Sequence, residues 1–229
     1  MRKQEFLCGV RDELPLLLGV FPFGMIYGVL AISAGLIPSA AQAMSSILFA
    51  GSAQFLTVQL AGAGTPWLVM VVTACIVNLR HALYSASVAP YLRPLSPVWK
   101  GVLAYVLTDE AYAVTITRYQ RPGDKTFAHW YFLGAGLTLW TAWQISTALG
   151  IFLGAQVPTS WALDFSLALT FIALVVPALK DRPAALAAIT AGVTALVAYP
   201  LPYKLGIILA ALIGIAAGWV SEARWSKSG

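Results

Sequence analysis

Long apolar stretches, broken at Pro, Gly and short charged clusters, run along almost the whole chain. Each stretch is long enough to cross a hydrocarbon core of about 30 Å as an α-helix. We therefore predict an all-α polytopic membrane bundle of about eight spans, built as a single domain over residues 1–229, with residues 1–13 and 221–229 outside the membrane. The predicted spans are 14–36, 39–62, 66–90, 98–119, 128–154, 160–179, 183–199 and 201–220.

The composition agrees with this pattern, because 59% of the residues are hydrophobic and only 10% are charged. Soluble domains carry about 25% charged residues, so that class is excluded. A phosphate-binding loop of the G-x-x-x-x-G-K-[ST] type does not occur, which argues against an ATP-driven pump. Cys8 and Cys75 lie in unlike settings and are interpreted as unpaired thiols. Nothing in the sequence predicts a catalytic group, a cofactor or a metal site.

Basic residues are distributed unevenly between the two sets of span ends. With the amino end in the cytoplasm, the outer side receives only Arg93, Lys100 and Lys204. The inner side receives Arg2, Lys3, Arg11, Arg118, Arg121, Lys125, Lys180, Arg182, Arg224 and Lys227. This asymmetry follows the positive-inside rule and predicts that both termini are cytoplasmic. The first apolar run is too long for a signal peptide, so we expect it to remain as the first span.

Three polar motifs interrupt these apolar helices: Gly51-Ser52-Ala53-Gln54-Phe55, Asn78-Leu79-Arg80-His81 and Leu107-Thr108-Asp109-Glu110-Ala111-Tyr112. Each lies near the middle of its predicted span, so we expect all three at one depth in the membrane. An Arg or Asp at a helix centre costs roughly 2.5 to 3.5 kcal/mol on insertion scales. That cost indicates a function, and a polar path or binding site for a transported solute is the hypothesis that explains it.

Arg80 keeps its charge and presents a planar fork, so it suits a substrate carboxylate or a partner among Asp109 and Glu110. Asp109 lies beside a polar stripe that includes Thr108, whereas Glu110 lies about 100° further round the helix. One Arg against two carboxylates leaves a surplus acid, unless His81 is protonated, and such an acid takes up a proton. We predict that Asp109, Glu110 and His81 serve proton coupling. A purely structural ion pair between the third and fourth spans is the alternative.

The small residues Gly51-Ser52-Ala53 favour a local interruption of the second span, which would expose backbone donors and acceptors to a zwitterionic solute. Close helix packing, with Gln54 bridging neighbouring helices, is the alternative. The predicted substrate-binding residues are Gly51, Ser52, Gln54, Asn78, Arg80, Tyr84 and Thr108.

Three G-x-x-x-G pairs predict close helix contacts: Gly24…Gly28, Gly150…Gly154 and Gly214…Gly218. The short seventh span is compatible with a re-entrant segment or with a helical hairpin turned by Pro200 and Pro202. Two landmark matches, Pro38-Ser39 with Pro158-Thr159 and Thr65-Pro66 with Arg182-Pro183, are compatible with a duplicated architecture but do not establish it.

Pro22-Phe23-Gly24, the three polar motifs and Tyr84 together resemble the AzlC family of bacterial inner-membrane amino-acid permeases. The resemblance covers nearly the whole chain, although beyond Phe127 it is mostly hydropathy, with Leu163-Asp164-Phe165 as a weaker landmark. It implies export of branched-chain amino acids across a bacterial inner membrane, together with a small membrane partner of the AzlD type. An amino acid would offer a carboxylate to Arg80 and an ammonium to Asp109 or Glu110.

Other functions remain open on the sequence alone. A channel, or a structural subunit of a larger complex, could keep the same motifs. An intramembrane serine protease would need Ser52 and His81 within hydrogen-bond reach of each other. Among coupling ions, the carboxylates and His81 favour protons over sodium.

Overall fold

In the computed structural model, the described residues are 2–122, 125–155, 179, 181–202 and 205–225. Every regular element among them is an α-helix, which confirms the predicted all-α membrane fold. The predicted span 160–179, the landmark Pro158-Thr159 and the landmark Leu163-Asp164-Phe165 lie outside the described residues, apart from position 179. The chain forms two compact units, one of Met1–Gly62 with Ala74–Pro158 and one of Ala63–Thr73 with Thr159–Gly229.

The first unit holds most of the helices. They are α1 (Arg2–Ser33), α2 (Pro38–Ile47), α3 (Gly51–Gly62), the end of α4 (Trp67–Val77), α5 (Leu79–Leu92), α6 (Pro97–Tyr105), α7 (Asp109–Gln120) and α8 (Ala128–Gly154). The predicted span 128–154 coincides with α8. The first helix starts at Arg2, well before the predicted span, and an ion pair between Glu5 and Arg118 of α7 (2.6 Å) ties down its first turns.

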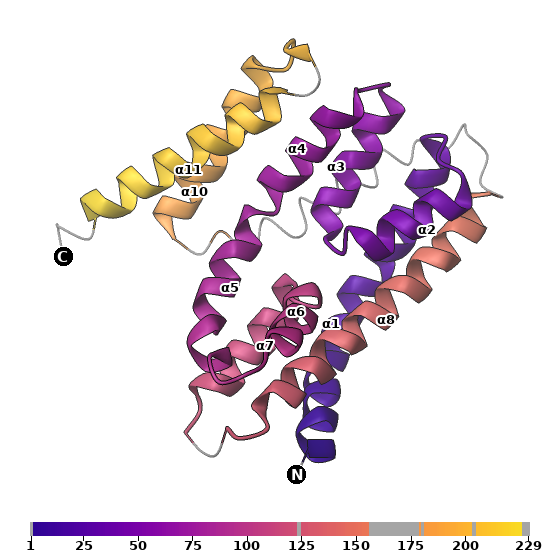
Figure 1. Ribbon diagram of the computed structural model, residues 1–229. Coiled ribbons are helices and arrows are strands. Elements are labelled where there is room, and N and C mark those ends of the chain that lie inside the picture. The colour runs from indigo at the N-terminus through magenta and orange to yellow at the C-terminus, as the bar shows by residue number, and fades with distance from the viewer. Residues whose placement is uncertain (1, 123–124, 156–178, 180, 203–204, 226–229) are drawn as a thin grey trace. The chain divides into compact units, whose positions relative to one another are not determined.

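The two long helices α1 and α8 pack side by side and run in the same direction (Figure 1). Glycines allow their backbones to touch along the whole length, as the predicted G-x-x-x-G pairs require. A Cβ placed on Gly9 would lie 2.1 Å from the Tyr131 carbonyl oxygen, and one on Gly28 would lie 2.5 Å from that of Thr147. The predicted pairs Gly24…Gly28 and Gly150…Gly154 therefore face one another. We call this contact between α1 and α8 the α1–α8 seam, and it is the central helix pair of the first unit.

The segment predicted as the second span enters and returns at the same end of this seam. Helix α2 starts with Pro38 at its first position, after four connecting residues that follow α1, and breaks at Leu48. Helix α3 then runs back, because Gly51 meets the Trp143 ring, while Gly62 at its far end meets Ala34. The predicted interruption of this span is confirmed, but the two halves form a hairpin and not one crossing helix.

The segment predicted as the fourth span is a second hairpin, which enters from the opposite end of the seam. Trp99 near the start of α6 packs on His129 and Trp130, at the beginning of α8. After the break at Val106–Thr108, α7 returns to the same end, where the Tyr119 hydroxyl donates to the Ala128 carbonyl. Helix α5 also arrives there, since the Tyr91 and Tyr119 rings lie 4.9 Å apart.

Half-length helices explain the difference from the prediction. At 1.5 Å per residue, α2, α3, α6 and α7 are only about 14 to 18 Å long, roughly half of a 30 Å hydrocarbon core. Two such helices joined by a short apolar break have the hydropathy of one full span, and hydropathy contains no information on direction. Among the described residues, four helical segments are long and apolar enough to cross a membrane: Arg2–Ser33, Trp67–Leu92, Ala128–Gly154 and Leu205–Ala223.

This topology moves Arg93 and Lys100 from the predicted outer side to the end of the unit where α1 begins. In a chain freed of Cys8 and Cys75, we expect single cysteines at Pro94 and Pro122 to react with an impermeant maleimide from the same side of the membrane. A cysteine at Ser39, at the other end of the seam, should react only from the opposite side. Labelling of Pro94→Cys and Pro122→Cys from opposite sides would contradict the hairpin.

The second unit contains α10 (Arg182–Val197) and α11 (Leu205–Trp225), which form an antiparallel hairpin. Asp181 caps the start of α10 by accepting from the Ala184 N–H at 2.7 Å, and Pro183 follows in its first turn. A Cβ on Gly214 would lie 2.7 Å from that of Ala191, so the predicted Gly214…Gly218 pair lies in this contact. Of the two alternatives for the seventh span, the helical hairpin is therefore observed.

Candidate functional site

The three predicted polar motifs coincide with three helix breaks in the first unit. Each motif occupies the start of the helix that follows its break: Gly51 is the first residue of α3, Asn78 precedes α5, and Thr108 precedes α7. Since the first turn of any helix leaves backbone N–H groups unpaired and carries the positive end of its dipole, these starts favour negative charge. The breaks therefore create the donors that a continuous helix would hide.

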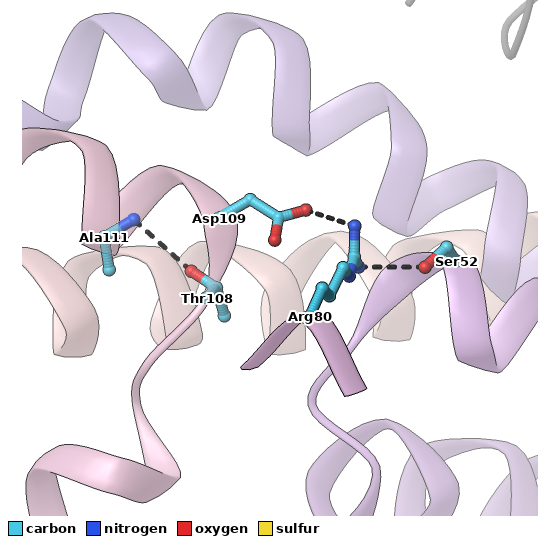
Figure 2. A network of polar contacts seen from close by, with 5 residues as sticks. All are labelled: Ser52, Arg80, Thr108, Asp109 and Ala111. Atoms are coloured by element: carbon cyan, nitrogen blue, oxygen red, sulfur yellow. Dashed lines mark hydrogen bonds and ion pairs between the residues drawn. The ribbon is translucent and has the colours of Figure 1, made fainter. Parts of the chain in front are cut away.

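Arg80 connects the three helix starts (Figure 2). Its Nη1 pairs with Asp109 Oδ2 of α7 at 2.5 Å, and its Nη2 donates to Ser52 Oγ of α3 at 2.9 Å. About a third of each charged side chain is exposed, 34% for Arg80 and 37% for Asp109. Of the two predicted carboxylate partners, Arg80 thus selects Asp109, and the pair is accessible enough to exchange partners.

Thr108 fixes the position of Asp109. Its hydroxyl accepts from the Ala111 N–H at 3.4 Å and caps α7, as Figure 2 shows. Its extended backbone ends the α6–α7 break, so Asp109 becomes the first residue of α7. Thr108 is buried and acts on the site through this cap.

Several buried polar atoms in the three polar motifs lack a hydrogen-bond partner among the described residues. They are both amide atoms of Gln54, Asn78 Oδ1, Arg80 Nε and Asp109 Oδ1. Gln54 is fully buried, and Asn78 precedes α5 without making a capping bond. A buried polar group without a partner costs about 1 to 3 kcal/mol, and native proteins keep few of them. The cluster has the chemistry of a binding site for a polar group.

The predicted residues Tyr84 and His81 lie on the next turns of α5. Tyr84 stacks on Tyr112 with ring centroids 4.5 Å apart, and the Tyr112 hydroxyl donates to Ser87 Oγ at 2.9 Å. His81 packs edge-on against Tyr84. This arrangement places both side chains close to Asp109, whose charge acts on each of them.

Glu110 lies next to Asp109 but forms no ion pair among the described residues. Its carboxyl lies beside its own backbone N–H and the Thr108 hydroxyl. The structure therefore brings together Ser52, Arg80 and Asp109 directly, with Tyr84 close to Asp109, while Gln54 and Asn78 belong to the same motifs as Ser52 and Arg80. The functional roles of all these residues stay predictions.

The sequence reasoning missed the contacts that join the two hairpin tips to α8. The Tyr105 hydroxyl donates to the Ser46 carbonyl at 2.6 Å and accepts from Trp140 Nε1 at 2.8 Å. Gln144 Oε1 accepts from Gln42 Nε2 at 2.8 Å and from Ser46 Oγ at 3.0 Å. Gln42 and Gln144 are amides inside apolar segments, and that signal could have been read from the sequence.

Comparisons with known proteins agree on one family. The family model described as AzlC protein matches residues 15–157, which include both hairpins and the whole Arg80 cluster. A membrane protein of Archaeoglobus fulgidus is 31% identical over 223 residues, covering 95% of this chain and 96% of its own length. The inner membrane protein YgaZ of Escherichia coli is 26% identical over 226 residues, covering 93% and 91%. No solved structure matches.

Proposed function

The chain belongs to the AzlC family of membrane proteins, and we propose that it is the large subunit of a secondary transporter that exports branched-chain or similar apolar amino acids. The observation that carries this proposal is the Arg80–Asp109 pair, bonded to Ser52 at the start of α3, together with buried polar atoms of the same motifs that lack partners among the described residues. Such helix starts inside a bundle bind charged groups of small solutes in transporters.

The site matches both charged ends of an amino acid. Arg80 and the N–H groups at the starts of α3, α5 and α7 suit the carboxylate, since all present positive charge. Asp109 suits the ammonium, helped by the carbonyl oxygens of Gln54 and Asn78. In this mechanism the Arg80–Asp109 pair closes the empty site, and the zwitterion replaces it by two new ion pairs with little net change in buried charge.

The apolar residues of the hairpin tips support an apolar side chain as cargo. Phe49 and Ala50 form one tip, and Val106 and Leu107 form the other; all four are buried. A hydrophobic surrounding of this kind recognises an aliphatic side chain but discriminates weakly between sizes, by about 1 to 3 kcal/mol per methylene. Leucine, isoleucine and valine are therefore proposed as a group.

The two hairpins favour a carrier over a channel. They enter from opposite ends of the α1–α8 seam, and their tips touch through Tyr105 and Ser46 beside the Arg80 cluster. Movement of one hairpin would open the site to one side while the other stays closed, which is alternating access. A channel would need both paths open together.

The proposed setting is the bacterial inner membrane, with the amino end of α1 in the cytoplasm. The hairpin topology supports this orientation, because it removes Arg93 and Lys100 from the exceptions to the positive-inside rule. A small membrane partner of the AzlD type, a proton as coupling ion and outward flux complete the proposal.

Leucine counterflow in proteoliposomes tests the function directly. We expect saturable uptake of labelled leucine into vesicles preloaded with unlabelled leucine, with competition by isoleucine and valine but not by lysine. Parallel vesicles with and without the small partner show whether the exchange needs it. Folded protein that shows no exchange in either preparation would count against the amino-acid assignment, and leucine flux without saturation would favour a channel.

The protease alternative is disfavoured by the geometry of Ser52. Its hydroxyl accepts from Arg80, and the His81 ring contacts Tyr84 instead of Ser52. A nucleophilic serine needs its base within hydrogen-bond reach.

A further inference from the structure

Glu13, in the first half of α1, is a buried acid that has no role in the proposed transport site. Its exposure is 0%, and neither carboxyl oxygen has a hydrogen-bond partner among the described residues. By contrast, the neighbouring Asp12 is exposed and accepts from the Tyr131 hydroxyl at 2.7 Å. An ionised carboxylate without donors is so costly in this setting that the group binds a proton instead. A Leu or Gln at this position would be buried at a lower free-energy cost, so the presence of an acid there indicates a function.

The helix that faces Glu13 brings a second acid to it. Helices α1 and α7 run antiparallel, with Glu5 and Arg118 paired at one end, and the charge of Glu110 acts on Glu13 further along. On α8, Tyr131 is the titratable side chain coupled to Glu13. Helices α2 and α3 also pack on α1, and neither contains a titratable residue. Arg118 pairs with Glu5, so among the described residues the charge that acts on Glu13 is that of an acid, Glu110.

The two acids differ in their surroundings. Burial disfavours the charge of Glu110 as well, but Glu110 lies at the positive start of α7, beside its own N–H and the Thr108 hydroxyl, and these groups offset part of that cost. Glu13 has no comparable donor. Two neighbouring carboxyls in a low-dielectric setting cannot both ionise readily, so the one without donors keeps the proton.

We propose that Glu13 and Glu110 form the proton-carrying acid pair of this transporter, with the proton on Glu13 in the state described. The inference rests on the proposed function and moves the coupling step from Asp109 to the α1–α7 contact. In each cycle the O–H bond of Glu13 breaks and its proton passes to water on one side, leaving a carboxylate. The pair then regains one proton from hydronium on the other side.

The position of Glu110 provides the link to the substrate. Both Asp109 and Arg80 act on Glu110 through their charges. When an amino acid separates the Arg80–Asp109 pair, the field at Glu110 changes, and so does the tendency of the acid pair to hold its proton. Substrate and proton therefore influence each other without sharing a ligand.

Infrared spectroscopy of the purified chain tests the protonation state without any transport assay. At neutral pH we expect a carbonyl band of a protonated carboxylic acid, sensitive to exchange into D2O, which disappears in Glu13→Gln. The matched control is Asp12→Asn, which removes the adjacent exposed carboxylate and should keep the band. A folded wild type without this band, or a band that survives in Glu13→Gln, would overturn the inference.

Proteoliposomes test the coupling itself. We expect Glu13→Gln to retain leucine counterflow, while its leucine accumulation driven by a pH gradient falls at least tenfold. The control Asp12→Asn should keep both activities. If Glu13→Gln does not fold, Glu13→Leu, which fills the same buried position with an apolar side chain, replaces it with the same expected split. Full gradient-driven accumulation in either folded variant overturns the acid pair while transport stands. Failure of wild-type counterflow overturns the proposed function. The protonation of Glu13 is then tested independently by the infrared experiment.

Discussion

Replacing Arg80 by Gln should lower leucine counterflow by about a hundredfold or more, because one side chain holds the starts of α3 and α7 and, in the proposed function, supplies the cation for the substrate carboxylate. Truncating one member of a hydrogen-bonded charge pair at a binding site costs about 2 to 5 kcal/mol. Most of that cost arises because Asp109 would be left charged without its only ion-pair partner among the described residues. Initial rates of counterflow, at matched amounts of folded protein, measure the effect.

Two further variants test whether counterflow depends on the two-nitrogen geometry of Arg80 or on its positive charge alone. Arg80→Lys keeps the charge but cannot reach Asp109 and Ser52 with two nitrogens at once, so we expect it to recover only a small part of the exchange. Arg118→Gln breaks a second Arg–carboxylate pair, with Glu5, at the end of α7. It should leave counterflow within about threefold of wild type, since peripheral ion pairs contribute only about 0 to 1 kcal/mol. Equal losses in Arg80→Gln and Arg118→Gln would show that Arg80 has only a structural role.

The Arg80 ion pair could be predicted from the sequence, because charged residues in apolar helices have few partners other than one another. Arg80 and Asp109 are the nearest opposite charges within the polar motifs, and the structure pairs them. The interruption at Gly51 was also readable, since small residues and a polar cluster weaken a helix there. The choice between Asp109 and Glu110 depends on which residue α7 places first after the Thr108 cap, and spacing alone does not fix that position.

The direction of the half-helices could not be predicted. Residues 98–119 have the length and hydropathy of a span, and only the packing of Trp99 and Tyr119 against the same end of α8 shows that the chain turns back. Glu13 was overlooked for a related reason. It lies before the first predicted span, among Arg11 and Asp12, and its burial arises from the extension of α1 along α7 and α8. Both features depend on tertiary contacts between distant segments.

The close contact of α1 with α8 predicts that the same Gly→Ala substitution lowers the free energy of unfolding at one position of α1 and raises it at another. Gly28→Ala places a methyl group 2.5 Å from the Thr147 carbonyl oxygen and 2.6 Å from the Ile151 nitrogen, which are backbone atoms that cannot rotate away. The helices must separate, and overpacking of this kind costs about 1 to 3 kcal/mol. We therefore expect a lower free energy of unfolding in detergent and a lower melting temperature.

Gly19→Ala, about two and a half turns earlier on the same helix, is the control. A Cβ there meets nothing within 4 Å, so the change should stabilise the chain by up to about 1 kcal/mol through the better helix propensity of Ala. Since both variants alter α1 by one methyl group, general effects of the substitution on helix formation or on detergent binding cancel in the comparison. If Gly28→Ala melted at or above the temperature of Gly19→Ala, the close contact of α1 with α8 would be refuted. The hairpins that this seam positions around Arg80 would then lose their support.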